Sequence, residues 1–293
     1  MPDAQSSLRR QRALLVERLL AKRLVDIREV ATGYSATERW LVRTEASTRH
    51  FVKIGSTPPS VRALRQEASV YERLSLPCMP KVVAWLDDDA IPILVLEDLS
   101  DYQWPPPWSN STIRMALDTI DGVHSSSAAL LPYEQRNQTA WDWWRAVERE
   151  PEPFLGLRLT TSRWLRSSLP RLIECANAVT PTGNAVTHFD LRADNFCFSA
   201  SEARLVDWSL ACLGNPKLDL GLFLPGLAAD GGPSPEEILP REPEVAAWVA
   251  GFFAWHASKP FIPSAPRVRL MQRKLLERAL PWAIRELQLE AAS

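Results

Sequence analysis

The chain has 293 residues, of which 46% are hydrophobic and 24% charged, and its formal net charge is −1 at pH 7. This composition is enough for a large buried core and excludes a disordered chain. The near-neutral charge, without runs of Lys and Arg between aromatic residues, argues against a nucleic-acid partner.

The four cysteines have no C-x-x-C spacing, which argues against both a zinc site and a disulfide framework. A reducing, cytoplasmic location is the expectation that follows. No stretch approaches the ~18 uninterrupted apolar residues of a membrane span, so we expect no membrane partner.

The front of the chain is predicted to be small and rich in strands. Residues 6–20 form an amphipathic helix with charges throughout, unlike the apolar core of a signal peptide. Short β-branched and apolar runs predict three strands, at residues 26–31, 39–43 and 50–54.

The segment between the first two predicted strands, residues 32–37, is small and rich in hydroxyl groups. Its residues Gly33 and Ser35 lie where backbone N–H groups can approach phosphates. The segment contains a single glycine rather than a G-x-G-x-x-G pattern, so a plain hairpin turn explains it as well.

Lys53 lies inside an apolar strand of a chain that otherwise prefers arginine, which indicates a position that selects a compact ammonium. The helix that follows carries an apolar stripe through Leu64, and Glu67 falls on that stripe. Because a carboxylate on an apolar face needs a partner, we predict that Glu67 pairs with Lys53. The alternative is that Glu67 reaches solvent from the edge of the stripe. Glu72 points away from the stripe and is expected to be solvated.

A buried strand at residues 91–96 leads into Glu97 and Leu99 and then into a Pro- and Trp-rich segment. This shift in composition predicts a boundary between an N-terminal lobe, residues 1–98, and a C-terminal lobe, residues 99–293. Apolar residues at helical spacing then predict five helices, at residues 112–125, 141–149, 162–178, 243–257 and 268–289.

One motif indicates a chemistry: His-Phe-Asp-Leu-Arg-Ala-Asp-Asn at residues 188–195, followed by Asp207 after a strand-like run. Asp190 is placed to accept a hydroxyl proton, while Asn195 and Asp207 offer oxygen atoms to a magnesium ion. A single Asp-x-x-x-x-Asn is often ordinary loop chemistry. The extended pattern, framed by apolar segments that anchor the loop, favours phosphoryl transfer instead.

Protein kinases follow their metal-binding Asp with Phe-Gly and a long segment ending in Ala-Pro-Glu. Here Asp207 is followed by Trp-Ser, and Gly-Asn-Pro-Lys-Leu-Asp-Leu-Gly arrives at residues 214–221. In this order the motifs resemble the aminoglycoside phosphotransferase and choline kinase superfamily, over about residues 27–225. The chain departs from that family at Arg192, where many members have His, and at Ser209, where many have an acidic residue.

The resemblance implies an α+β, two-lobed protein-kinase-like fold with a small antiparallel β-sheet in the N-terminal lobe and a mostly helical C-terminal lobe. It implies a nucleotide site in which Lys53, paired with Glu67, reaches the phosphates of ATP. The other nucleotide-binding residues that it implies are Gly33, Ser35 and, through main-chain atoms of a hinge, Glu97 and Leu99.

The resemblance also implies roles within the catalytic loop. Asp190 would act as the base or orient the hydroxyl, and His188 would brace the loop. Asn195 and Asp207 would bind Mg²⁺, and Asp219, at the start of a helix, would brace the loop from outside.

We therefore expect an ATP- and Mg-dependent phosphotransferase that acts on a hydroxyl of an aminoglycoside-like, choline-like or sugar-like small molecule. Tryptophans of the helical lobe would cage a quaternary ammonium, although Trp on helices is more often core. Acidic residues near 142–152 would meet a polycation, although a solvated helix face explains them as well. The alternatives are a protein kinase and a nucleotide-binding pseudokinase scaffold. The oligomeric state and the choice between ATP and GTP stay open.

Overall fold

The computed structural model describes residues 2–30, 37–88, 91–136, 142–263 and 265–292. The chain divides into two compact units, residues 1–103 together with 204–209, and residues 104–203 together with 210–293. The predicted boundary at residues 98/99 thus lies near the first division. The short segment 204–209, which the sequence alone places in the C-terminal lobe, groups with the first unit.

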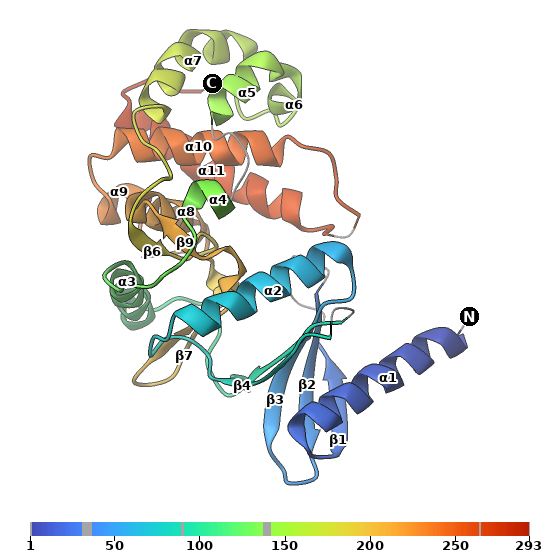
Figure 1. Ribbon diagram of the computed structural model, residues 1–293. Helices are drawn as coiled ribbons and strands as arrows, with labels where there is room; N and C mark the ends of the chain where they lie inside the picture. The colour runs from blue at the N-terminus through green and yellow to red at the C-terminus, as the bar shows by residue number, and fades with distance from the viewer. Residues whose placement is uncertain (1, 31–36, 89–90, 137–141, 264, 293) are drawn as a thin grey trace. The chain divides into compact units, whose positions relative to one another are not determined.

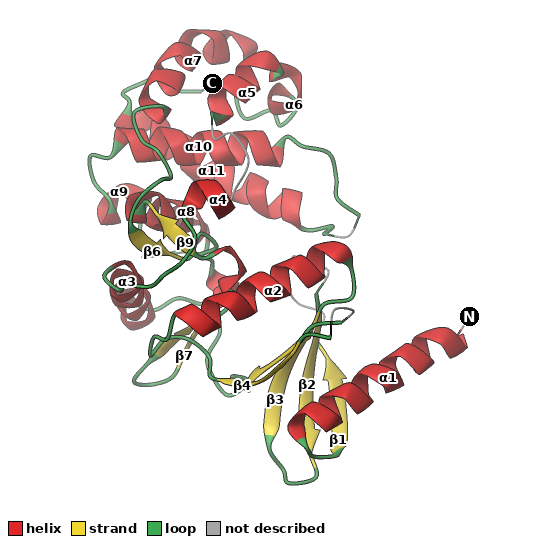
Figure 2. Ribbon diagram, in the orientation of Figure 1, coloured by secondary structure: helices red, strands yellow, loops and turns green. Residues whose placement is uncertain are grey.

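The first unit is built on a five-stranded sheet in the order β1-β2-β3-β5-β4 (Figures 1 and 2). All four strand pairings are antiparallel. The strands are β1 (Leu24–Glu29), β2 (Glu38–Thr44), β3 (Arg49–Ile54), β4 (Val82–Leu86) and β5 (Ile93–Glu97). The strands predicted at residues 26–31, 39–43, 50–54 and 91–96 are confirmed, and β4 is an addition to them.

Helix α1 (Pro2–Leu20) covers one face of this sheet. Its Val16 is fully buried against side chains of β2, β3 and β5, among them Val52 and Ile54. Burying a valine side chain contributes about 1.5–3 kcal/mol. The N-terminal helix is therefore part of the first unit's fold rather than a separate tail.

Helix α2 (Pro58–Arg73) covers the opposite face, beginning at a capping box formed by Thr57. Its Leu64 packs on side chains of β5. Because successive side chains of a strand point to opposite faces, Lys53 of β3 faces α2, whereas its neighbour Val52 faces α1.

The second unit is mostly helical (Figure 2). Its helices are α3 (Asn110–His124), α4 (Tyr133–Arg136), α5 (Trp143–Arg149), α6 (Pro151–Leu155), α7 (Ser162–Ala176), α8 (Pro216–Ala229), α9 (Pro235–Ile238), α10 (Pro243–Ala257) and α11 (Val268–Glu286). The five predicted helices correspond to α3, α5, α7, α10 and α11. Strands β6 (Ala185–Thr187) and β9 (Cys212–Gly214) pair antiparallel. Strand β7 (Phe196–Phe198) follows residues 188–195, and β8 (Ala203–Leu205), most of which belongs to the first unit, comes next in the chain.

Helix α10 forms the centre of the second unit's core, and ten of its residues are buried. Trp144 of α5 is fully buried against it and donates its indole N–H to the carbonyl of Ala247 at 2.7 Å. None of the described helices has the length and apolar character needed to cross a membrane.

All four cysteines are free thiols. Burial raises the pKa of both Cys78 and Cys212 to about 11. These two thiols are therefore protonated at neutral pH and are weak nucleophiles.

Candidate phosphoryl-transfer site

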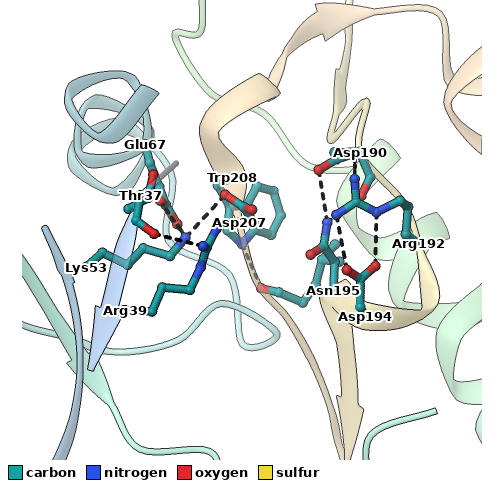
Figure 3. Close-up of polar contacts among 11 residues, drawn as sticks. Thr37, Arg39, Lys53, Glu67, Asp190, Arg192, Asp194, Asn195, Asp207 and Trp208 are labelled. Atoms are coloured by element: carbon teal, nitrogen blue, oxygen red, sulfur yellow. Dashed lines mark hydrogen bonds and ion pairs between the residues drawn. The ribbon is translucent and has the colours of Figure 1, made fainter. Parts of the chain in front are cut away.

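Two carboxylates of the first unit hold the ammonium of Lys53 (Figure 3). The Nζ atom donates to both oxygens of Glu67, at 2.8 and 2.7 Å, and to Oδ1 of Asp207 at 3.2 Å. The side chains of Lys53 and Glu67 are 5% and 2% exposed, and that of Asp207 is 25% exposed. The predicted Lys53–Glu67 pair is present, and Glu72 is solvated as predicted, with 64% of its side chain exposed.

This pair keeps Lys53 charged despite its burial. Burial works to lower the pKa of Lys53, but Asp207 and Glu67 outweigh burial and raise that pKa above its usual value. Burial also raises the pKa of Glu67, and the ammonium of Lys53 opposes that rise. Removing one partner of a buried ion pair leaves an uncompensated charge, which costs about 3–5 kcal/mol.

Asp207 lies in a tight turn after β8, with a φ of +65°. Left-handed backbone at a residue other than glycine is uncommon, although Asp adopts it more readily than most. The turn is fixed by Trp208, which is fully buried and donates its indole N–H to the carbonyl of Leu205 at 2.7 Å. The carboxylate is thereby aimed at Lys53 while part of it stays open to solvent.

The catalytic loop, residues 188–195, belongs to the second unit and is braced by Asp219 of α8. The Asp219 carboxylate accepts the backbone N–H of His188 at 2.8 Å and that of Phe189 at 2.7 Å. Nε2 of His124 lies 3.0 Å from the same carboxylate. The predicted bracing contact is therefore present. His124, the last residue of α3, is a second brace that the sequence interpretation missed, because a lone histidine at a helix end carries no motif.

His188 is fully buried, and its Nδ1 accepts the backbone N–H of Asp190 at 3.2 Å. Between them Phe189 has a φ of +54°. Buried within the loop, His188 orients the backbone that carries Asp190. The bracing role of His188 stays a prediction, and this hydrogen bond is the contact on which it depends.

Two donors orient the carboxylate of Asp190 (Figure 3). Nη1 of Arg192 donates to Oδ1 at 2.9 Å, and Nδ2 of Asn195 donates to Oδ2 at 3.2 Å. Arg192 also pairs with Asp194, at 3.0 and 3.3 Å. The departure from the family at Arg192 therefore adds a cation that binds the Asp190 carboxylate directly and orients it.

The predicted metal ligands fit magnesium in their chemistry. The Nδ2 of Asn195 also donates to the carbonyl of Asp190 at 2.7 Å, which turns the Asn195 side-chain oxygen away from Asp190. This oxygen and the Asp207 carboxylate are hard donors of the type Mg²⁺ prefers. No three His, Cys, Asp or Glu of the described residues gather to hold an ion by themselves. Magnesium here would depend on phosphate oxygens as further ligands, as it commonly does.

The structure describes only two of the other four residues predicted to contact the nucleotide, Glu97 and Leu99. Gly33 and Ser35 lie outside the described residues. The N–H of Glu97 already donates to the carbonyl of Lys81 at 3.0 Å, so this N–H is not the group that would contact an adenine. Leu99 is buried, and its carbonyl accepts the N–H of Tyr102 at 3.1 Å. The adenine-binding role of this hinge stays a prediction.

The sequence profile of the phosphotransferase enzyme family matches residues 26–261. The chain belongs to this family. The match confirms the predicted family and the predicted enzyme class. A search of curated proteins finds no significant match.

Solved structures confirm the predicted kinase-like fold. The chain is similar to a thermostable mutant of an aminoglycoside phosphotransferase, with a TM-score of 0.58 and 11% identity over 94% of this chain and 98% of that chain. It is similar to a spectinomycin phosphotransferase in complex with ADP and spectinomycin, with a TM-score of 0.57 and 12% identity over 96% and 98% of the two chains. A putative fructosamine-3-kinase from Thermobifida fusca has a TM-score of 0.57 and 16% identity, over 93% and 98%. At sequence identities of 11–16%, these similarities show a shared fold and nothing further.

Proposed function

We propose that the chain transfers the γ-phosphoryl group of ATP, in the presence of magnesium, to a hydroxyl group of a small molecule. The observation that supports this proposal is a group of oriented polar side chains within each of the two units. The first unit holds a buried ammonium between two carboxylates, and the second holds an aspartate oriented by two donors. The family membership of the chain supports the same reaction class.

The roles follow from the chemistry of each group. Lys53 binds the nucleotide phosphates, and Asp207 and Asn195 supply oxygen ligands to magnesium, which would neutralise charge on the phosphates. Asp190 accepts the proton of the acceptor hydroxyl or orients that hydroxyl for attack. His188 positions Asp190. Catalysis then comes mainly from positioning and charge neutralisation.

The two alternatives have less support. A pseudokinase scaffold would not need the full set of Lys53, Asp190, Asn195 and Asp207, and all four are oriented by polar contacts. A protein kinase needs a long segment after its metal-binding Asp to carry a peptide. Here the chain after Asp207 goes directly into a short turn, then into β9 and α8.

Sugar-like hydroxyl compounds are the acceptor class that we favour, because the features suited to cationic acceptors have other partners. Trp143, Trp144 and Trp248 belong to the hydrophobic core rather than to an aromatic cage. Trp255 has the ammonium of Lys259 at 3.0 Å from its ring centroid, which would repel a quaternary ammonium.

The acidic residues near α5 are also engaged. Asp142 caps the helix by accepting the N–H of Arg145 at 3.2 Å, and Glu148 pairs with the Arg145 side chain at 2.9 Å. Glu150 lies 3.7 Å from Lys259. A solvated, internally paired helix surface therefore explains this cluster without a polycationic acceptor.

The test is to incubate the protein with γ-labelled ATP and magnesium in two parallel reactions. One contains a panel of sugars, glycated amines, amino alcohols, choline and aminoglycosides, and the other contains lysate proteins. We expect saturable transfer to a compound of the panel and negligible label in proteins. Label in proteins at about 1 s⁻¹ or more, with none in the panel, would show a protein kinase instead. Nucleotide binding without transfer in either reaction would favour a scaffold.

A further inference from the structure

Arg39 of β2 lies directly across from Lys53 of β3. The two residues are register partners in the antiparallel pair, so their side chains project from the same face of the sheet, with Cβ atoms about 4.5–5.5 Å apart. Figure 3 shows the guanidinium of Arg39 and the ammonium of Lys53 ending beside each other, near Asp207. No motif in the sequence includes Arg39.

A second cation at this position costs free energy unless it meets an anion. Like charges directly opposite each other on adjacent strands destabilise a sheet, and burial of Lys53 weakens the screening of that repulsion. Arg39 lies close enough to act electrostatically on both Lys53 and Glu67. The phosphate chain of a nucleotide is an anion that two neighbouring cations can bind together.

We propose that Arg39 binds the phosphate chain of the nucleotide together with Lys53, so that the site selects nucleoside di- and triphosphates over nucleosides. This inference rests on the proposed role of Lys53 in binding the phosphates. The two side chains supply different chemistry, because a guanidinium binds phosphate oxygens through a planar fork, whereas an ammonium acts as a point charge.

Arg39 also makes a local backbone contact: its Nη1 donates to the carbonyl of Thr37 at 3.0 Å. Thr37 is the last residue of segment 32–37, for which the sequence leaves phosphate binding and a plain hairpin turn as alternatives. The side chain thus connects the end of that segment to the position of Lys53. A purely structural role for this hydrogen bond would affect stability and every ligand alike, which separates it from phosphate binding.

The test is titration calorimetry of the wild-type chain, Arg39→Ala and Arg39→Gln with adenosine, with ADP, and with a non-hydrolysable ATP analogue plus magnesium. Glutamine removes the charge and keeps an N–H donor for the Thr37 carbonyl. We expect both variants to bind ADP and the ATP analogue about tenfold more weakly, which corresponds to about 1.4 kcal/mol. Their affinity for adenosine should equal that of the wild type.

Arg43 is the matched control, because it lies on the same strand and the same face but opposite Arg49 rather than Lys53. Arg43→Ala should bind all three ligands as the wild type does, and melting curves should confirm that each variant is folded. Wild-type ADP affinity in Arg39→Gln would overturn the inference, as would an equal loss of adenosine and ADP affinity. Failure of the wild-type chain to bind any of the ligands would overturn the proposed nucleotide role itself.

Discussion

Asp190→Asn should lower kcat by about 10²–10⁴-fold while leaving the fold and the affinity for magnesium-ATP nearly unchanged. Asparagine keeps the shape of the side chain but cannot accept the hydroxyl proton. The loop backbone should survive the change, because Asp219 holds it through the N–H groups of His188 and Phe189. Steady-state kinetics with the identified acceptor measures kcat, and calorimetry measures the affinity for magnesium-ATP.

Asp194→Asn is the matched control for this experiment. Asp194 lies in the same loop and also pairs with Arg192, but its side chain is 45% exposed and we assign it no chemical role. Turnover in Asp194→Asn should stay close to that of the wild type. If Asp190→Asn retained wild-type turnover, Asp190 would be neither the base nor the group that orients the hydroxyl.

Lys53→Met and Glu67→Gln should each lower both kcat/KM and the free energy of unfolding, and their effects should not add in the double mutant. Lys53→Met leaves the buried Glu67 carboxylate without the ammonium, and Glu67→Gln removes one of the two carboxylates that contact Lys53. Leaving a buried charge without its partner costs about 3–5 kcal/mol. The double mutant removes both charges, so its loss in the free energy of unfolding should be smaller than the sum of the two single losses. Kinetics and chemical denaturation of the wild type, the two single variants and the double mutant measure the coupling free energy. We expect it to reach about 1–3 kcal/mol.

An exposed ion pair on helix α2, which also carries Glu67, serves as the control for this double-mutant cycle. Arg73 and Glu72 lie 3.8 Å apart with side chains 48% and 64% exposed, so Arg73→Met and Glu72→Gln should couple by less than about 0.5 kcal/mol. Additive losses for Lys53 and Glu67, like those of the control pair, would show that the two side chains do not act as a unit.

Groups that share a local motif could be predicted from the sequence. The spacing of Asp190, Asn195 and Asp207 lies within one loop and the strand that follows it, so the chain itself sets their order. The helical period also placed Glu67 among buried side chains, and a buried carboxylate has few partners available. Together with the kinase-like motif further along the chain, this pattern predicts Lys53 as its partner.

Groups that depend on long-range register could not be predicted. Arg39 faces Lys53 because the turn between β2 and β3 sets which residues pair, and a shift of one residue would have turned Arg39 to the other face. His124 meets Asp219 only because the end of α3 lies against the loop. Neither contact leaves a pattern in the sequence.

Some elements have no clear periodic pattern in the sequence. Helix α8 is apolar on nearly all sides and contains Gly221 and Pro225, so only the resemblance, through Asp219 at its start, indicates it. Strand β4 is a short continuous apolar run without alternation, and such a run is ambiguous between strand and helix.

Phosphorus NMR of the wild-type protein with ATP, magnesium and the acceptor panel tests phosphoryl transfer most directly. We expect a new phosphomonoester signal that grows as the γ-phosphate signal of ATP disappears, in equal amounts, with ADP as the other product. Adding excess chelator to remove magnesium should stop the transfer. Release of inorganic phosphate alone, or transfer that continues at the same rate without magnesium, would contradict magnesium-dependent phosphoryl transfer to a small molecule.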